Sequence, residues 1–327
     1  MDIKNVVDKL GYVDAEIDAN LDLVAEIARL KEQKQAVILA HYYQPAEVQA
    51  IADFVGDSLA LSQRAANLNR PLILFAGVRF MAETAKILAP QSKVILPDLN
   101  AGCSLADSCG YDAFREFVEQ HPDHKVVTYV NTTAEIKSLS YICCTSSNAV
   151  QVVNSIPAHE PVIFAPDRNL GGYIKRLTCR QNMVVWDGAC HVHDQFSVQR
   201  ILELKQQHPQ AKIIAHPECK QPVLLLADFV GSTAQLLSYT QQQSATDFIV
   251  ATEAGILTEM MRANPSKKYI PAPPDDSTCA CNECSYMKLT TLKKMYLSLL
   301  HELPEIHVDP ELANKARVPI ERMLRVV

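Results

Sequence analysis

The chain repeats one pattern of strands, helices and polar loops three times, and each copy ends near a cysteine. Ser58, Ser146 and Ser232 are 88 and 86 residues apart, and Cys103 precedes Cys190 by 87 residues. Three copies of one unit, each with a thiol at the same point, predict three similar domains around a common axis where the cysteines meet. Such a centre would hold a metal through three thiolates and leave one coordination position open.

Short apolar runs alternate with helical patterns in every copy, which is typical of parallel strands covered by helices. Each copy reads as three strands, with helices between them. We therefore predict an α/β fold with three similar αβα domains, whose parallel sheets are arranged about a pseudo-threefold axis. The expected parts are a leading helical segment (1–34), three units (35–121, 122–208 and 209–285) and a trailing helical segment (286–327).

Composition narrows the functional classes. A net charge of −6 without Lys/Arg blocks argues against a nucleic-acid partner. The apolar runs are far shorter than the roughly 20 residues that span a bilayer, which argues against a membrane protein. The acidic start lacks the apolar core of a signal peptide, so we expect a cytoplasmic protein.

In a cytoplasmic protein of this size, the ten cysteines are more often metal ligands, catalytic groups or core residues than disulfides. Five of them have mixed apolar or basic neighbours and are predicted to fill the core. These five are Cys109, Cys143, Cys144, Cys179 and Cys219.

Polar side chains gather where the first strand of each copy is expected to end, and in parallel sheets ligands bind at that edge. The side chains at these strand ends are His41, Tyr43, Tyr129, Asn131, His216 and Glu218. Together with His193, the histidines are candidates for proton transfer near neutral pH, and Glu218 is a candidate general base. The alternative is that they are ordinary structural residues.

Hydroxyl groups recur where helices are expected to begin, at Ser58, Ser146, Ser232 and Thr233. They suit N-caps, and with the helix N-terminal amides they could also bind phosphate or carboxylate oxygens. The two roles are compatible. The sequence contains neither GxGxxG nor GxxxxGK[ST], so it gives no support for a nucleotide site.

The third copy offers three thiols, at Cys279, Cys281 and Cys284. One thiol from each copy could bind tetrahedral zinc or three corners of an iron–sulfur cluster. Strict repeat spacing favours Cys279, which follows Cys190 by 89 residues, over Cys284, which follows it by 94. Cys281 and Cys284 could instead form a disulfide-capable CxxC pair. Spacing alone leaves the third ligand open.

Nine segments between residues 36 and 300 resemble, in order, the motifs of the quinolinate synthase family. They are AHYYQPAEVQAIADFVGDSLALS, AGCSLAD, TYVNTTAEIKSLSYICCTSSNAV, APDRNLGGYI, WDGACHVHDQF, HPECK, GSTAQLL, ATEAGI and CSYMKLTTL. The resemblance implies a transferase of NAD biosynthesis that condenses iminoaspartate with dihydroxyacetone phosphate to quinolinate, with loss of phosphate and water. It also implies L-aspartate oxidase as the supplier of the imine.

The resemblance further implies a [4Fe–4S] cluster held by Cys103, Cys190 and Cys284, with one open iron. The residues that match family positions for acid–base work and orientation are His41, Tyr43, Tyr129, His193, His216 and Glu218. Those that match positions for binding substrate carboxylates and phosphate are Ser58, Asn131, Ser146, Ser232 and Thr233, beside His41, Tyr129, His216 and Glu218.

Two departures from the family pattern occur near the last cysteine. Some members carry CxxCxxC there, whereas this chain has CACNEC, and Ser285 stands where proline is frequent. Two other functions compete with the synthase. A non-catalytic iron–sulfur sensor would leave the polar strand ends unexplained. A zinc-dependent lyase or hydrolase using Cys190, His191 and His193 would leave Cys103 and the repeat unexplained.

Overall fold

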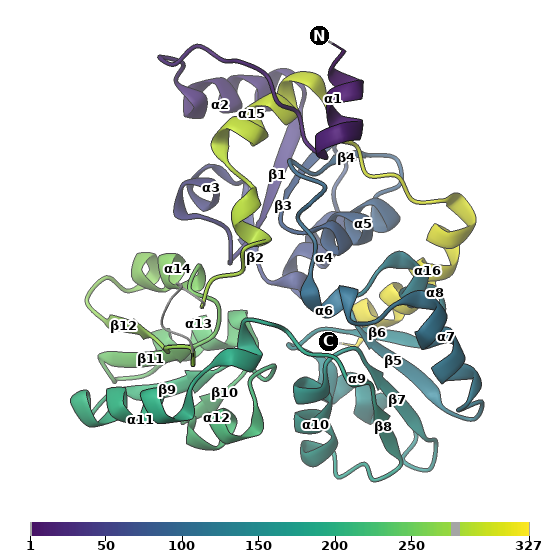
Figure 1. Cartoon of the computed structure of the whole chain (residues 1–327), viewed down its shortest axis with the longest axis vertical. Helices are drawn as coiled ribbons and strands as arrows, with labels where there is room; N and C mark the ends of the chain where they lie inside the picture. The colour runs from purple at the N-terminus through teal and green to yellow at the C-terminus, as the bar shows by residue number, and fades with distance from the viewer. Residues whose placement is uncertain (1, 276–281, 327) are drawn as a thin grey trace. The chain divides into compact units, whose positions relative to one another are not determined.

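The computed structural model describes residues 2–275 and 282–326, which form two compact units. Unit 1 comprises Met1–Cys103 and Ser285–Arg317, and unit 2 comprises Ser104–Cys284 and Val318–Val327. Unit 1 contains one four-stranded sheet and unit 2 contains two (Figure 1). All strand pairs in the three sheets are parallel.

The sheet of unit 1 has the order β2-β1-β3-β4. Its strands are β1 (Ala36–His41), β2 (Phe54–Gly56), β3 (Leu72–Ala76) and β4 (Lys93–Ile95). The helices of this unit are α1 (Ile3–Leu10), α2 (Leu23–Gln33), α3 (Ala46–Ile51), α4 (Ser58–Ala66), α5 (Arg79–Leu88), the 3-10 helix η2 (Met287–Leu289) and α15 (Leu292–His301). The last helix, α16 (Pro310–Arg325), contains the boundary between the two units.

The first sheet of unit 2 has the order β6-β5-β7-β8 and the second has the order β10-β9-β11-β12. The strands are β5 (Lys125–Tyr129), β6 (Ile142–Cys144), β7 (Val162–Ala165), β8 (Met183–Val185), β9 (Lys212–Ala215), β10 (Phe229–Val230), β11 (Asp247–Ala251) and β12 (Lys268–Pro271). The helices are α6 (Ser104–Asp107), α7 (Tyr111–Glu119), α8 (Ala134–Ser138), α9 (Ala149–Ser155), α10 (Arg168–Leu177), η1 (His193–Gln195), α11 (Val198–Gln207), α12 (Gln221–Leu226), α13 (Thr233–Gln242) and α14 (Ile256–Ala263).

Each sheet has the same strand order, so the α/β class and the three similar parallel sheets are confirmed. The backbone repeats as well. The residue before each second strand donates its N–H to the first strand, in pairs Asp53–Ile38, Tyr141–Val126 and Asp228–Ile213, at 3.0, 2.8 and 2.7 Å. The arrangement of the three sheets about an axis, and the domain limits given above, stay predictions.

The expectation of three strands per copy was wrong, because every sheet has a fourth strand at its edge. These edge strands are β2, β6 and β10, and they contain only three, three and two residues. Two of them, β2 and β10, are only partly buried, so they lack the long apolar run that marks the neighbouring strands.

The leading and trailing helical segments pack as predicted. Ile27 of α2 and Met295 and Leu299 of α15 share a buried cluster with Ile38 of β1 and Leu74 of β3. Both helices therefore lie over the first sheet and belong to its core. Within the described residues, no helix has both the length and the apolar character needed to cross a membrane.

Candidate functional site

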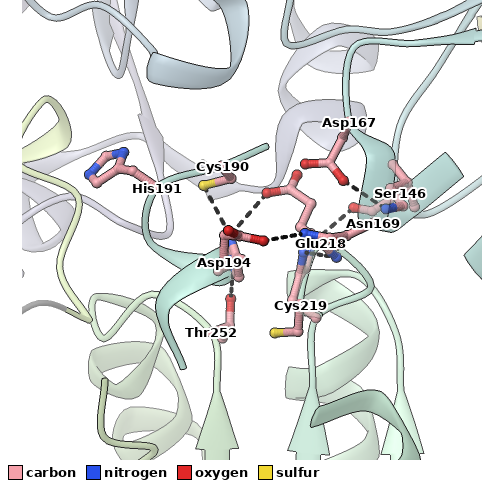
Figure 2. Close-up of polar contacts among 12 residues, drawn as sticks. Ser146, Asp167, Asn169, Cys190, His191, Asp194, Glu218, Cys219 and Thr252 are labelled. Atoms are coloured by element: carbon pink, nitrogen blue, oxygen red, sulfur yellow. Dashed lines mark hydrogen bonds and ion pairs between the residues drawn. The ribbon is translucent and has the colours of Figure 1, made fainter. Parts of the chain in front are cut away.

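Four of the predicted catalytic side chains lie together in unit 2, close to the ends of two strands. Figure 2 shows the polar contacts around one of them, Glu218. Tyr129 is the last residue of β5, and His216 directly follows β9. Glu218 lies two residues further, and His193 opens η1. Parallel strands direct the residues at their carboxyl ends to one edge of a sheet, which explains how polar side chains gather here.

His193 is the centre of this group. Its Nδ1 lies 2.9 Å from Oε2 of Glu218 and 3.2 Å from Sγ of Cys190. Its Nε2 lies 2.9 Å from the hydroxyl oxygen of Thr252. A carboxylate only accepts hydrogen bonds, so we assign the ring proton to Nδ1, where it faces Glu218 and the sulfur. Nε2 then accepts a hydrogen bond from the Thr252 hydroxyl.

His216 has the opposite tautomer. The backbone N–H of Glu218 donates to Nδ1 of His216 at 3.4 Å, so that nitrogen carries no proton. Its Nε2–H therefore donates to the Ser146 hydroxyl, 3.2 Å away. The His193 and His216 rings are 4.7 Å apart between centroids. The site thus places two buried imidazoles side by side, with their protons on different nitrogens.

Two neighbouring carboxyl groups of the site, those of Glu218 and Asp167, have pKa values that are shifted in opposite directions. Burial alone would raise the pKa of Glu218, but His193, His216 and the Tyr129 hydroxyl outweigh it and hold that pKa at about 2. Burial, and then the negative charge of Glu218, raises the pKa of Asp167 well above its usual value. Burial lowers the pKa of His216 to about 3, so its ring is neutral at pH 7. Carboxyl groups with divergent pKa values are typical of functional sites.

Asp167 is a site residue that the sequence patterns did not single out. It is fully buried, and its side chain accepts the backbone N–H of Leu170 at 2.7 Å, which caps α10. The backbone N–H of Cys190 also bonds to it. It lies within the quoted segment APDRNLGGYI, but no periodicity or spacing marks it.

The hydroxyls that were predicted to bind substrate fall into two groups. Ser232 caps α13 through a complete capping box, and Thr233 is the first residue of that helix. Ser58 and Ser146, however, are not N-caps: Asp57 caps α4 through the N–H of Ala60, and Asn148 occupies the N-cap position of α9. The carboxylate of Asp57 has two acceptor oxygens and takes that role one residue earlier, while the Ser146 hydroxyl bonds to His216.

Asn131 follows β5 by two residues, and its Oδ1 atom is buried without a hydrogen-bond partner among the described residues. A buried amide oxygen without a partner is costly. This atom is therefore suited to accept a hydrogen bond from a bound molecule.

The remaining predicted residues belong to unit 1. His41 is the last residue of β1, and the backbone N–H of Tyr43 donates to its Nδ1 at 3.2 Å. This bond repeats the one that Glu218 makes to His216. The His41 and Tyr43 rings are 4.5 Å apart and edge to face. Ser58 opens α4, and Cys103 is a partly exposed cysteine at the end of the first part of the unit.

The backbone identifies which cysteine of the third copy corresponds to the first two. In each copy, one strand ends in an alanine: β3, β7 and β11. The residue three positions after that alanine donates its N–H to a backbone carbonyl, in the pairs Arg79–Ala101, Arg168–Gly188 and Ala254–Asn282, at 2.7, 2.8 and 2.9 Å. Each accepting carbonyl lies two residues before a cysteine, namely Cys103, Cys190 and Cys284. Among the described residues, Cys284 therefore lies at the repeat position of Cys103 and Cys190. Cys279 and Cys281 lie outside the described residues, so the choice of third ligand stays a prediction.

The other cysteines differ from these three. Cys109, Cys143, Cys144 and Cys219 are buried as predicted, and burial raises their pKa values, that of Cys109 to about 12. Cys179 was predicted to be buried but is exposed. It follows the C-cap of α10 with φ of +52°, a turn that carries it out of the core. Cys190 and Cys284 are partly exposed and pack on one hydrophobic cluster of unit 2.

Three potential ligand atoms, from Cys190, His193 and Glu218, lie within 4.8 Å of one another. This set differs from the local zinc site considered above, because Glu218 stands where His191 was expected. The Nδ1 atom of His191 instead lies 2.7 Å from the hydroxyl of Ser104, the residue after Cys103. The residues that follow Cys103 and Cys190 are thus hydrogen bonded to each other.

Comparison with known proteins agrees with this geometry. The family described as "Quinolinate synthetase A protein" matches residues 25–325. A quinolinate synthase from Synechococcus sp. is 57% identical over 307 residues, which cover 94% of this chain and 96% of the relative. Those of Thermosynechococcus vestitus and Microcystis aeruginosa are 57% and 56% identical, over 94% and 93% of this chain and 96% and 95% of theirs. The chain belongs to the quinolinate synthase family.

Proposed function

We propose that this protein is a quinolinate synthase of NAD biosynthesis. It condenses iminoaspartate with dihydroxyacetone phosphate and releases phosphate and water. Family membership supports the assignment, because relatives at 54–57% identity carry this name over almost the whole chain. The site in unit 2 supports it too: ionised, neutral and hydroxyl side chains meet at strand ends, as a condensation with several proton transfers needs.

Cys103, Cys190 and Cys284 would hold a [4Fe–4S] cluster. The observation that carries this ligand set is the repeated backbone hydrogen bond two residues before each of these three cysteines. Their chemistry also fits, since all three are partly exposed thiols, whereas the buried cysteines have raised pKa values. When bound, the cluster supplies a Lewis-acidic iron that can polarise oxygen or nitrogen groups of a substrate.

The protein side chains provide acid–base groups with fixed protonation. Glu218 stays ionised at neutral pH and holds the His193 proton at Nδ1, which leaves Nε2 as an acceptor beside Thr252. His216 stays neutral and offers its Nε2–H to the Ser146 hydroxyl or to a substrate oxygen that replaces it. A neutral imidazole acts well as a hydrogen-bond donor to a carbonyl oxygen. His41, Tyr43 and Tyr129 share in orientation and proton transfer.

Both substrates are anionic, which suits hydroxyl groups and helix N-termini. Ser232 and Thr233 at the start of α13, with Ser146 and Ser58, would bind carboxylate or phosphate oxygens. The unpaired Oδ1 of Asn131 would accept from a substrate hydroxyl or N–H. The cytoplasm as location and L-aspartate oxidase as source of the imine belong to the same proposal.

The test is anaerobic purification followed by iron and sulfide counts and a quinolinate assay with both substrates. We expect about four iron and four sulfide per chain and quinolinate formation that requires both substrates. A colourless protein that contains about one zinc and no sulfide would overturn the proposal.

That outcome would favour a zinc-dependent lyase or hydrolase. One observation supports this second candidate, namely the proximity of Cys190, His193 and Glu218. A tetrahedral zinc with three protein ligands keeps one position for substrate. This candidate predicts that Cys103→Ser and Cys284→Ser retain the metal, whereas the synthase predicts that both lose it.

A further inference from the structure

Two buried carboxyl side chains of unit 2 occupy equivalent positions of the repeat. Asp167 and Glu253 each lie two residues after the alanine that ends their strand, Ala165 of β7 and Ala251 of β11. Both side chains are fully buried. A buried carboxylate is costly unless several hydrogen bonds satisfy it, so two of them at one repeat position call for an explanation.

Both carboxylates bond to the backbone of a cysteine. Oε1 of Glu253 accepts the N–H of Cys284 at 3.0 Å, and the carboxyl of Asp167 accepts the N–H of Cys190. Each also holds the start of the following helix. Oε2 of Glu253 accepts the N–H of Gly255 at 2.7 Å, and Oδ1 of Asp167 accepts the N–H of Leu170 at 2.7 Å.

We infer that Asp167 and Glu253 are positioning residues that lock the Cys190 and Cys284 loops to the helix beside each loop. A carboxylate that bonds to both a helix N-terminus and a cysteine N–H fixes the backbone from which the thiol projects. The inference rests on the proposed role of these cysteines as cluster ligands. Groups that orient metal ligands typically change metal affinity 10–100-fold when they are removed.

The equivalent residue of the first copy is Val78, which has no acceptor atom in its side chain and precedes α5 without a side-chain cap. The device is therefore a property of unit 2 and not of the repeat as such. In the loop of Cys284, a second backbone bond, from Ala254 to the carbonyl of Asn282 at 2.9 Å, completes the attachment. Removing Glu253 would break the bond to the Cys284 N–H and leave the Ala254–Asn282 bond in place.

The experiment compares Glu253→Leu and Glu253→Gln with a matched control, Asp228→Asn. Asp228 belongs to the same copy and also accepts a backbone N–H, that of Ile213 at 2.8 Å, but neither this bond nor its bond to Lys212 involves a cysteine. Two quantities are measured: hydrogen exchange of the Cys284 amide in the metal-free protein, and the rate of iron release from the loaded protein to a chelator.

For Glu253→Leu we expect amide exchange at Cys284 to rise at least about 10-fold and iron release to accelerate about 10–100-fold. Glu253→Gln keeps one acceptor oxygen and should fall between this variant and the wild type, and Asp228→Asn should match the wild type. Unchanged exchange and release in Glu253→Leu, or equal changes in Asp228→Asn, would overturn the inference.

Two further outcomes can also be interpreted. If Glu253→Leu does not fold, Glu253→Gln and Asp167→Asn provide the same two readouts, at Cys284 and at Cys190. If the wild type binds no cluster, the proposed function fails on iron counts alone. The exchange measurement still decides whether the carboxylate holds the loop.

Discussion

The first copy of the repeat, in unit 1, and the third copy, in unit 2, share a backbone but not its chemistry. Both place a histidine at the carboxyl end of the first strand, His41 or His216, and in both the backbone N–H two residues later donates to the histidine Nδ1. That later residue is Tyr43 in one copy and Glu218 in the other. The backbone hydrogen bonds therefore fix a histidine tautomer in both copies, while the neighbouring side chain differs.

The same contrast holds one strand later. Val78 in unit 1 stands where Glu253 stands in unit 2, although the backbone bond that precedes the cysteine is present in both. The backbone that presents the thiol is thus the same in the first and third copies, and the third copy has a carboxyl side chain where the first has Val78. Equivalent positions of the two copies should therefore differ in how strongly their mutation changes activity or stability.

The largest difference between the two copies should be in the loss of kcat caused by Glu218→Gln and by Tyr43→Phe. Glu218→Gln removes the negative charge beside the His193 proton at Nδ1 and replaces one acceptor oxygen with an amide group, so we expect kcat to fall about 10³-fold. Tyr43→Phe keeps its backbone bond to His41 and should lower kcat only about 10-fold. Steady-state quinolinate formation measures both, and equal losses would remove the distinction between the copies.

A second difference concerns how the stability of the fold depends on pH. In unit 2, burial lowers the pKa of His216 from 6.5 to about 3. The unfolded chain therefore binds a proton between these values that the folded chain does not, and stability falls as pH falls. From pH 7 to 5 the loss attributable to His216 is about 2 kcal/mol.

Urea unfolding midpoints of the metal-free protein at the two pH values measure this loss. His216→Gln should remove it, whereas replacing the exposed His159 with Gln should leave it in place. A wild-type midpoint that stays constant between pH 7 and 5 would contradict the assignment of a neutral buried ring.

The smallest difference, close to zero, should be in the loss of unfolding free energy caused by Asp53→Asn and by Asp228→Asn. Both carboxylates accept a strand N–H at 2.8 Å, from Ile38 or Ile213, and both pair with a lysine. Each substitution should lower the stability of its own unit by about 1–2 kcal/mol. Thermal denaturation monitored separately for the two units checks this, and a difference above about 1 kcal/mol would show that the frames are not equivalent.

Much of this architecture was predictable from the sequence, since long buried strands and repeated polar ends leave clear patterns. The edge strands were not, because strands of two or three residues, such as Phe229–Val230, carry no periodic signal. Asp167 was not predicted for another reason. Its role depends on a hydrogen bond from the backbone of Cys190, a residue that is distant from it in the sequence. Spacing alone left the last cysteine open, because the third copy is longer before Cys284. The backbone bond of Asn282 supports Cys284, whose role as a ligand stays a proposal.

The central claim is that one thiol from each copy, and Cys284 from the third, holds an iron–sulfur cluster. Iron and sulfide counts on anaerobically purified Cys284→Ser and Cys279→Ser test it most directly. We predict that Cys279→Ser keeps about four of each and that Cys284→Ser has none. A cluster retained in Cys284→Ser and lost in Cys279→Ser would contradict the account.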